Sequence, residues 1–119
     1  MAYTLRYKHG PAMAVAEVSC LAFIETAEPV LLEIEAHTQR HRDRRLLVNL
    51  RDVVGTMGPQ EHALIGKLAV RHLAHLERVA SLVAEDKITR VSEGVARAQG
   101  MQLRVFTQLT EAVAWLLDE

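Results

Sequence analysis

The stretch Leu46-Leu47-Val48-Asn49-Leu50 lies near the middle of this chain of 119 residues and is apolar at four of its five positions. A strand that is apolar on both faces is typical of the centre of a parallel sheet, where helices cover both sides. Residues 51–58 contain Gly55 and Gly58 and are predicted to form a loop, because glycines interrupt regular structure. Pro59 suits the first turn of a helix. This part of the chain therefore predicts a buried strand, a loop and a helix in succession.

The helix after this loop has the clearest periodic pattern in the sequence. One helical face carries Ile65, Leu68, Ala69, His72, Leu73 and Leu76. Their spacing of three and four residues predicts an amphipathic helix over residues 59–76. Leu64 and Val70 lie off that face, and Met57 precedes the helix. These additional apolar residues could cover a ligand cavity, contact a membrane or a second copy of the chain, or pack under a neighbouring loop.

The remaining elements follow from the same kinds of pattern. Alternating polarity predicts strands at residues 3–8 and 13–18, which form a hairpin around the break at residues 9–11. Short apolar runs predict strands at residues 79–83 and 103–106. Helical spacing predicts a helix from Thr26, as its N-cap, to the arginines at 40–45; a helix over 88–98 that Gly100 stops; and a helix from Thr107, again as its N-cap, to Leu116.

The order of these elements predicts the fold class. It reads β-β-α-β-α-β-α-β-α, and strands that alternate with helices form parallel sheets with right-handed crossovers. The N-terminal hairpin adds an antiparallel strand at one edge. We therefore predict a single α/β domain over residues 1–119, with a mixed, mostly parallel sheet of about five strands and with about four helices.

Composition limits the class of protein. Lys and Arg total 14 and Asp and Glu total 15, so the basic excess that nucleic-acid-binding proteins need is absent. Hydrophobic residues make up 50% of the chain and aromatic residues 4%, which predicts an aliphatic core. The N-terminus lacks the layout of a signal peptide, and no apolar run approaches the roughly 18 residues of a membrane span. With the single Cys20, these features predict a soluble cytoplasmic protein without an internal disulfide.

The candidate binding site is the loop between the central strand and the helix at residues 59–76. Ligands of open parallel sheets bind beyond the carboxyl ends of the strands, and the free N–H groups of a following helix favour an anion. We expect Asp52 to order the loop and Thr56 to supply a hydroxyl contact. The candidate residues are Arg51, Asp52, Gly55, Thr56, Gly58, Glu61 and His62. The alternative is that the glycines serve turn geometry and that Asp52 satisfies local backbone amides.

Other polar residues suggest no reaction centre. The histidines at 62, 72 and 75 do not form a metal-ligand motif, and His72, on the apolar face, is expected to be hydrogen-bonded at the edge of the core. Residues 37–45 hold four arginines and two histidines, which either contact phosphates or form a solvated helix end; the lack of aromatic residues favours the second. Cys20 is expected to be a small buried residue, and no nucleophile elbow occurs. We therefore predict a non-enzymatic protein with no catalytic residue, metal or cofactor.

The central stretch and three later stretches resemble a known family. Leu46-Leu47-Val48-Asn49-Leu50-Arg51-Asp52-Val53 is similar to the central strand of STAS domains, the fold of anti-sigma-factor antagonists. The stretches RHLAHLERVA (71–80), GMQLRVFT (100–107) and EAVAWL (111–116) resemble the bacterial SpoIIAA-like subgroup, also described as STAS/CRAL-TRIO-like. The resemblance extends over residues 3–118 and implies the α/β architecture described above.

The resemblance also implies functions, with one departure. STAS phosphoswitches carry an Asp-Ser pair after the central strand, and a partner kinase phosphorylates the serine. Residues 54–59 of this chain contain no serine, so only Thr56 could accept a phosphoryl group. The leading hypothesis is a binding or regulatory module that recognises a partner protein, or a small apolar or anionic ligand, through loop 52–58 and helix 59–76.

The resemblance implies two alternative functions. The first is a lipid- or membrane-associated carrier of the CRAL-TRIO-like type, which rests on an analogy between folds. The second is an anti-sigma-antagonist phosphoswitch that uses Thr56. Peripheral membrane contact and a homodimer remain open, and nucleic acid is not an expected partner.

Overall fold

The computed structural model describes residues 2–118 and shows the expected order of elements. The strands are β1 (Tyr3–Lys8), β2 (Ala14–Leu21), β3 (Arg45–Val54), β4 (Arg78–Leu82) and β5 (Leu103–Phe106). The helices are α1 (Ile24–His41), α2 (Pro59–Leu73), α3 (Val91–Ala98) and α4 (Leu109–Leu117), and a 3₁₀ turn, η1 (Glu85–Lys87), precedes α3. Within residues 2–118, no helix combines the length and the apolar character that a membrane span requires.

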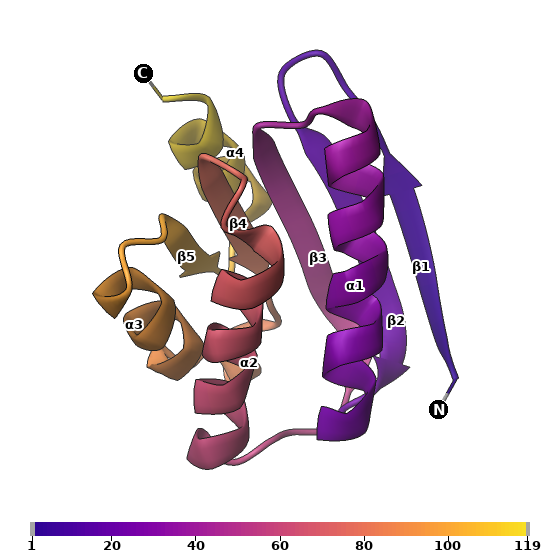
Figure 1. Ribbon diagram of the computed structural model, residues 1–119. Coiled ribbons are helices and arrows are strands. Elements are labelled where there is room, and N and C mark those ends of the chain that lie inside the picture. The colour runs from indigo at the N-terminus through magenta and orange to yellow at the C-terminus, as the bar shows by residue number, and fades with distance from the viewer. Residues whose placement is uncertain (1, 119) are drawn as a thin grey trace.

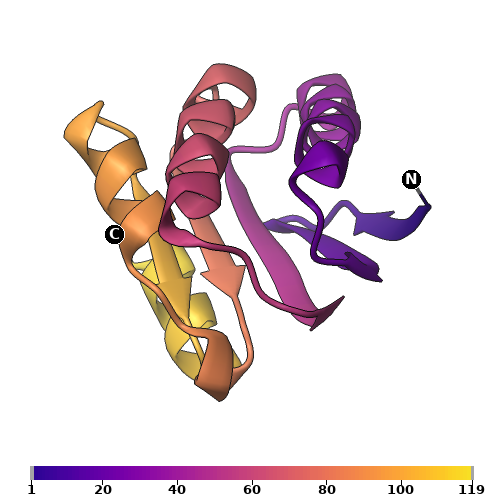
Figure 2. The ribbon, with the colours of Figure 1, turned by 90° about the horizontal axis from the view of Figure 1, so that it is seen from below.

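The strands form one sheet in the order β1-β2-β3-β4-β5. β1 pairs with β2 in antiparallel orientation, and the pairs β2–β3, β3–β4 and β4–β5 are parallel. Successive crossovers move one strand at a time in the same direction, and because such crossovers are right-handed, their helices lie on the same face. α1, α2 and α3 cover that face, and α4 lies on the other (Figure 1, Figure 2). The predicted fold class is confirmed.

β3 is the buried central strand that its apolar run predicts. Leu46, Leu47 and Val48 are each at most 6% exposed. Leu46 and Val48 pack in the cluster that the sheet forms with α1, α2 and α3, whereas Leu47 packs in a smaller cluster with α4. Because successive side chains of a strand point to opposite faces, both faces of β3 need an apolar cover, and the helices supply it.

β3 is longer than its apolar run. It continues through residues 51–54, because β2 pairs with it as far as Leu21 opposite Val54. A register shift between Glu17 and Ser19 accommodates one extra residue in β3, and Asn49 Oδ1 accepts the Arg51 backbone N–H there at 3.1 Å. The predicted loop 52–58 is therefore wrong in its first part, and the connection to α2 consists of residues 55–58.

α2 is shorter than the range 59–76 that its apolar periodicity predicts. It ends at Leu73, not at Leu76, because residues 74–77 turn the chain back toward the sheet. The Leu76 N–H donates to the Leu73 carbonyl at 3.0 Å, and the Glu77 N–H donates to the Arg44 carbonyl at 2.6 Å. The second of these bonds sets the start of β4 beside the start of β3. Leu76 is still buried, which explains why it fits the apolar pattern.

The predictions that Thr26 and Thr107 are N-caps are wrong. α1 begins at Ile24 with Phe23 at its N-cap, and α4 has Gln108 at its N-cap; neither N-cap side chain bonds to the helix. Thr26 lies in the first turn of α1, is 4% exposed and donates its backbone N–H to the Phe23 carbonyl at 3.1 Å. The threonine pattern therefore misses the observed N-caps by three residues in α1 and by one residue in α4.

α3 differs from its predicted range of 88–98 at one end. η1 occupies residues 85–87, and Thr89 Oγ1 accepts the Val91 backbone N–H at 3.3 Å just where the helix begins. The other end agrees with the sequence, since Gly100 follows α3 at a φ of 88° and donates its N–H to the Arg97 carbonyl at 2.9 Å.

Hydrogen bonds also connect α3 and its N-cap residue to the edge strand β5. The carboxylate of Glu93, which is 8% exposed, accepts the Val105 backbone N–H at 2.7 Å. Arg90 donates to the same carboxylate at 3.0 Å and to the Val105 carbonyl at 2.9 Å. These contacts satisfy backbone groups that an edge strand otherwise leaves free.

Candidate ligand cavity at the carboxyl ends of the strands

A cavity of about 400 Å³ lies between the sheet and the helices α1, α2 and α3. All of its exposed lining residues lie where the parallel strands β2, β3 and β4 end or just beyond. They are Leu21, Phe23, Gly55, Thr56, Pro59, Asp86 and Ile88. The cavity therefore opens at the carboxyl edge of the sheet, which is where ligands of open α/β sheets bind.

The inner wall of the cavity is aliphatic. The sheet contributes, among others, Val18, Val48, Val79 and Leu103, and the helices contribute Val30, Ile34, Ala69 and Leu73. Protein interiors are close-packed and contain few voids larger than a water molecule. A cavity of about 400 Å³ is far above that size and within the range of about 300–1,000 Å³ that is typical of small-molecule sites.

Few polar groups lie near the opening. Thr56 and Asp86 are exposed lining residues, and His62 and Lys87 are half-buried lining residues. Lys87 Nζ donates to the Val53 carbonyl at 2.7 Å, which ties η1 to the end of β3. An apolar interior with a small number of polar groups at one end suits a ligand that is mostly apolar.

The sequence-predicted site residues separate into three groups in the structure. Gly55, Thr56 and His62 line the cavity. Gly55 has a φ of 102°, which only glycine adopts without strain. Gly58 and Glu61 build the start of α2 instead: Glu61 Oε1 accepts the Gly58 backbone N–H at 2.9 Å.

Arg51 and Asp52 lie in β3 and do not line the cavity. Arg51 donates from Nε to Asn49 Oδ1 at 3.2 Å, and exposed Asp52 sits opposite Ser19 of β2. Asp52 is therefore placed in the strand, not in the loop that it was expected to order. Two hydrogen bonds fix the end of β3, where the connection to α2 starts. The Ala22 N–H donates to the Val54 carbonyl at 2.8 Å, and Lys87 donates to the Val53 carbonyl.

Sequence reasoning missed the cavity residues that other loops contribute. Cys20 and Phe23 come from the end of β2 and the connection to α1, and Lys87 and Ile88 come from the connection between β4 and α3. The rule that the carboxyl ends of parallel strands meet at one edge could have found these residues, because each follows a predicted strand.

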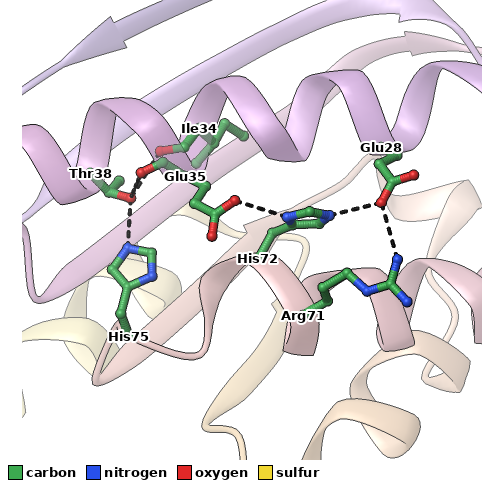
Figure 3. Close-up of polar contacts among 7 residues, drawn as sticks. All are labelled: Glu28, Ile34, Glu35, Thr38, Arg71, His72 and His75. Atoms are coloured by element: carbon green, nitrogen blue, oxygen red, sulfur yellow. Dashed lines mark hydrogen bonds and ion pairs between the residues drawn. The ribbon is translucent and has the colours of Figure 1, made fainter.

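A polar cluster of residues that do not line the cavity joins α1 to α2 (Figure 3). The ring nitrogens of His72 lie 2.9 Å from a carboxylate oxygen of Glu28 and 2.9 Å from one of Glu35. A ring with an acceptor at both nitrogens is satisfied as an imidazolium that donates to both. The hydrogen bond to Glu28, followed by that to Glu35, raises the pKa of His72, and burial opposes them. This geometry confirms the expectation of a hydrogen-bonded histidine at the edge of the core.

His75, which lies in the turn after α2, makes a separate contact with α1. The Thr38 hydroxyl donates to the Ile34 carbonyl at 2.8 Å and lies 2.9 Å from His75 Nε2, so His75 is the donor to the hydroxyl oxygen (Figure 3). The acceptors of His72 and His75 differ, and in residues 2–118 no three His, Cys, Asp or Glu side chains converge in a way that could hold a metal ion.

Asp43, Arg44 and Arg45 make internal contacts, whereas Arg40 and Arg42 are exposed at the end of α1. Asp43, 8% exposed, accepts hydrogen bonds from the Tyr7 hydroxyl and from His9 Nδ1, the latter at 2.6 Å. Burial, with the hydrogen bond to Asp43, raises the pKa of Tyr7. The exposed residues 40–42 agree with the expected solvated helix end, and Glu77 pairs with Arg44 and Arg45.

Comparisons with known proteins agree with this architecture. The sequence pattern of the SpoIIAA-like family matches residues 17–117. No curated protein matches the sequence. Among solved structures, an anti-sigma factor antagonist from Mycobacterium paratuberculosis is similar with a TM-score of 0.67 and 15% identity, over 98% of this chain and 96% of that one.

A second solved structure carries the same fold. It is an uncharacterized protein of the DUF3478 family, with a SpoIIAA-like fold, from Shewanella loihica PV-4, with a TM-score of 0.54 and 14% identity over 96% of this chain and 93% of that one. At these identities the likeness is one of fold, while the family match covers most of the chain. The chain belongs to the SpoIIAA-like family.

Proposed function

We propose that this protein is a non-enzymatic regulatory module that binds a small, mostly apolar molecule in the cavity at the carboxyl edge of its sheet. The observation that carries the proposal is the aliphatic cavity of about 400 Å³ with few polar groups near its opening. Its volume is at the lower end of the range for small-molecule sites, which favours a single-chain or single-ring ligand over a two-chain lipid.

The groups around the cavity support binding without a reaction. Cys20 lines the cavity, and burial raises the pKa of its thiol, so the reactive thiolate is disfavoured. Nucleophilic catalysis needs a base within hydrogen-bonding reach of the nucleophile. The hydrogen bonds of residues 2–118 include none between His62 and a hydroxyl or thiol group of the cavity.

A regulatory role follows from where the ligand would sit. The exposed connection at residues 55–58 contributes Gly55 and Thr56 to the cavity lining, so an occupied cavity would change the surface that a protein partner contacts. The solved structure of an anti-sigma factor antagonist shares this fold. That likeness supports a role in which the chain binds a protein partner and the ligand alters the binding.

Ligand uptake is tested with N-phenyl-1-naphthylamine, an uncharged apolar fluorophore. We expect saturable binding with one site per chain and slower modification of the Cys20 thiol when the dye is bound, because Cys20 lines the cavity. Ala27→Phe places a ring in the cavity and should weaken dye binding at least about tenfold. Ala36→Phe, at an exposed position of the same helix that does not line the cavity, is the matched control.

Two results would contradict the proposal. One is dye binding that does not saturate and leaves the reaction rate of Cys20 unchanged. The other is an Ala27→Phe variant that is folded, by its circular dichroism spectrum and cooperative unfolding, and binds the dye as the parent does.

A second candidate function is a phosphoswitch at Thr56. Its side chain is exposed in the connection between β3 and α2, and the chain shares the fold of an anti-sigma factor antagonist. A phosphate there would add negative charge and new acceptors beside the cavity opening. Phosphopeptide mapping of the protein isolated from its native cells tests this: phosphate on Thr56 supports the switch, and unmodified Thr56 under all growth conditions contradicts it.

A third candidate is a membrane-associated carrier. The rim of the cavity, which we define as the lining residues Leu21, Phe23 and Ile88, consists of large apolar side chains that are 40–55% exposed. Exposed apolar patches of this kind occur at membrane and protein contacts. Co-sedimentation of the protein with liposomes would support a carrier, and protein that stays in the supernatant at all lipid compositions would contradict it.

A further inference from the structure

Lys87 places a positive charge at the opening of a cavity whose inner wall is aliphatic. Its side chain is half-buried and lines the cavity, and Nζ donates to the Val53 carbonyl at 2.7 Å. A lysine ammonium has three donors and no acceptor. The bond to Val53 uses one of them and holds the ammonium against the end of β3, directly before the connection that carries Thr56.

Lys87 has no anionic partner in the described part of the chain. Several arginines pair with glutamates, Arg44 with Glu77 and Arg90 with Glu93 among them, but the ion pairs within residues 2–118 do not include Lys87. Charges that leave water are normally paired, because desolvation of an unpaired charge is costly. The half-buried ammonium is therefore suited to an anionic group that a ligand brings.

The surroundings of Lys87 limit the charge of that group. Asp86 also lines the cavity and is exposed at the same edge. The carboxylate of Asp86 repels negative charge on a ligand. This repulsion disfavours a dianionic headgroup, such as a phosphate monoester, more than a monoanionic one. A single carboxylate is the anion that one ammonium and one neighbouring carboxylate accommodate best, and Thr56 offers a hydroxyl donor to it at the same opening.

We propose that the ligand is a monocarboxylate with a single apolar chain, which lies in the cavity and pairs its carboxylate with Lys87. This inference rests on the proposed function, since it specifies the ligand of the same cavity. The chain fills the aliphatic interior, the carboxylate stays at the opening, and the charge-assisted hydrogen bond from Nζ selects acids over neutral molecules of the same length.

A matched pair of ligands isolates the contribution of the charge. Decanoate and decanol share the apolar chain and differ in the head group, and each competes with N-phenyl-1-naphthylamine for the cavity. We expect the parent to bind decanoate at least about tenfold more tightly than decanol at low salt, because charge-assisted hydrogen bonds are stronger than neutral ones.

Variants of lysine complete the design. Lys87→Gln should weaken decanoate binding about tenfold and leave decanol binding unchanged, whereas Lys87→Arg, which keeps the charge, should retain the preference. Lys67→Gln is the matched control, since Lys67 is an exposed lysine of α2 that does not line the cavity. Circular dichroism and thermal unfolding confirm that each variant is folded.

The outcomes separate this inference from the proposed function. Equal affinity of the parent for decanoate and decanol, or an unchanged preference in Lys87→Gln, would overturn the assignment of a monocarboxylate while leaving an apolar cavity in place. Failure of both ligands to displace the dye would overturn the assignment together with the proposed function.

Discussion

His72 lies between two glutamates of α1, and its proton helps to hold α1 and α2 together. The contacts raise the pKa of His72 above its ordinary value of 6.5, so the folded chain holds this proton more tightly than the unfolded chain. The resulting stabilisation is fully present below pH 6.5 and is lost as the pH rises through the raised pKa. The hydrogen bond from His72 lowers the pKa of Glu28, whose contribution is lost on acidification.

The change His72→Gln tests this account. We expect it to reduce the free energy of unfolding clearly at about pH 6 and by less at about pH 9, because the parent itself loses the proton as the pH rises. Urea denaturation of parent and variant at both pH values measures the difference. The same loss at both pH values would show that His72 stabilises the fold by packing alone.

The sequence predicted the environment of His72 but not its partners. Its place on the apolar face of residues 59–76 indicates burial, and a buried polar group needs hydrogen bonds. Glu28 and Glu35 lie 44 and 37 residues away. Which α1 side chains face His72 depends on how the two helices pack, and no local pattern contains that information.

At the scale of elements, Gly66 allows α2 and α3 to approach closely. A Cβ atom at Gly66 would lie 2.7 Å from the Ser92 carbonyl oxygen and 2.9 Å from Val95 Cβ. Gly94, in α3, is a matched position, because a Cβ atom there would have no neighbour within 4 Å. Alanine substitution at Gly94 therefore tests helix propensity alone, whereas substitution at Gly66 also tests the packing of α2 against α3.

We expect Gly66→Ala to lower the free energy of unfolding by about 1–3 kcal/mol, because the backbone of α3 must shift. Gly94→Ala should raise it by about 0.5–1 kcal/mol, since alanine favours the helix and nothing is displaced. Thermal and urea unfolding of both variants measure these changes. A stabilising Gly66→Ala would contradict the close approach of the two helices.

Periodicity predicted which elements form, and tertiary contacts decided where they end. The apolar run at residues 46–50 marks β3, but pairing of Leu21 with Val54 extends the strand beyond it. Leu76 fits the apolar face of α2 although the helix ends at Leu73, because a buried turn residue fits the same pattern as a helical one. These boundaries depend on contacts with neighbouring elements, so the pattern along a single segment does not predict them.

At the scale of the whole molecule, topology explains the location of the candidate site. The order of strands and helices, with right-handed crossovers, predicts that α1, α2 and α3 share one face and that the connections after β2, β3 and β4 meet at one edge. The cavity itself could not be predicted, because its volume is what remains after the side chains of three helices and the sheet have packed. Its lining residues Phe23 and Lys87 come from connections that carry no motif of their own.

The most direct test of the central claim uses two neighbouring residues of β3. Val48 lines the cavity, whereas Leu47 packs against α4 on the opposite face of the sheet. Decanoate is titrated into methyl-labelled protein, and intermolecular nuclear Overhauser effects are recorded between the ligand chain and the protein methyl groups. We expect effects to the methyl groups of Val48 and Ile34 that saturate at one equivalent, and none to Leu47. Saturating decanoate that leaves the Val48 methyl signals unchanged, or that contacts Leu47 instead, would contradict a ligand site between the sheet and α1, α2 and α3.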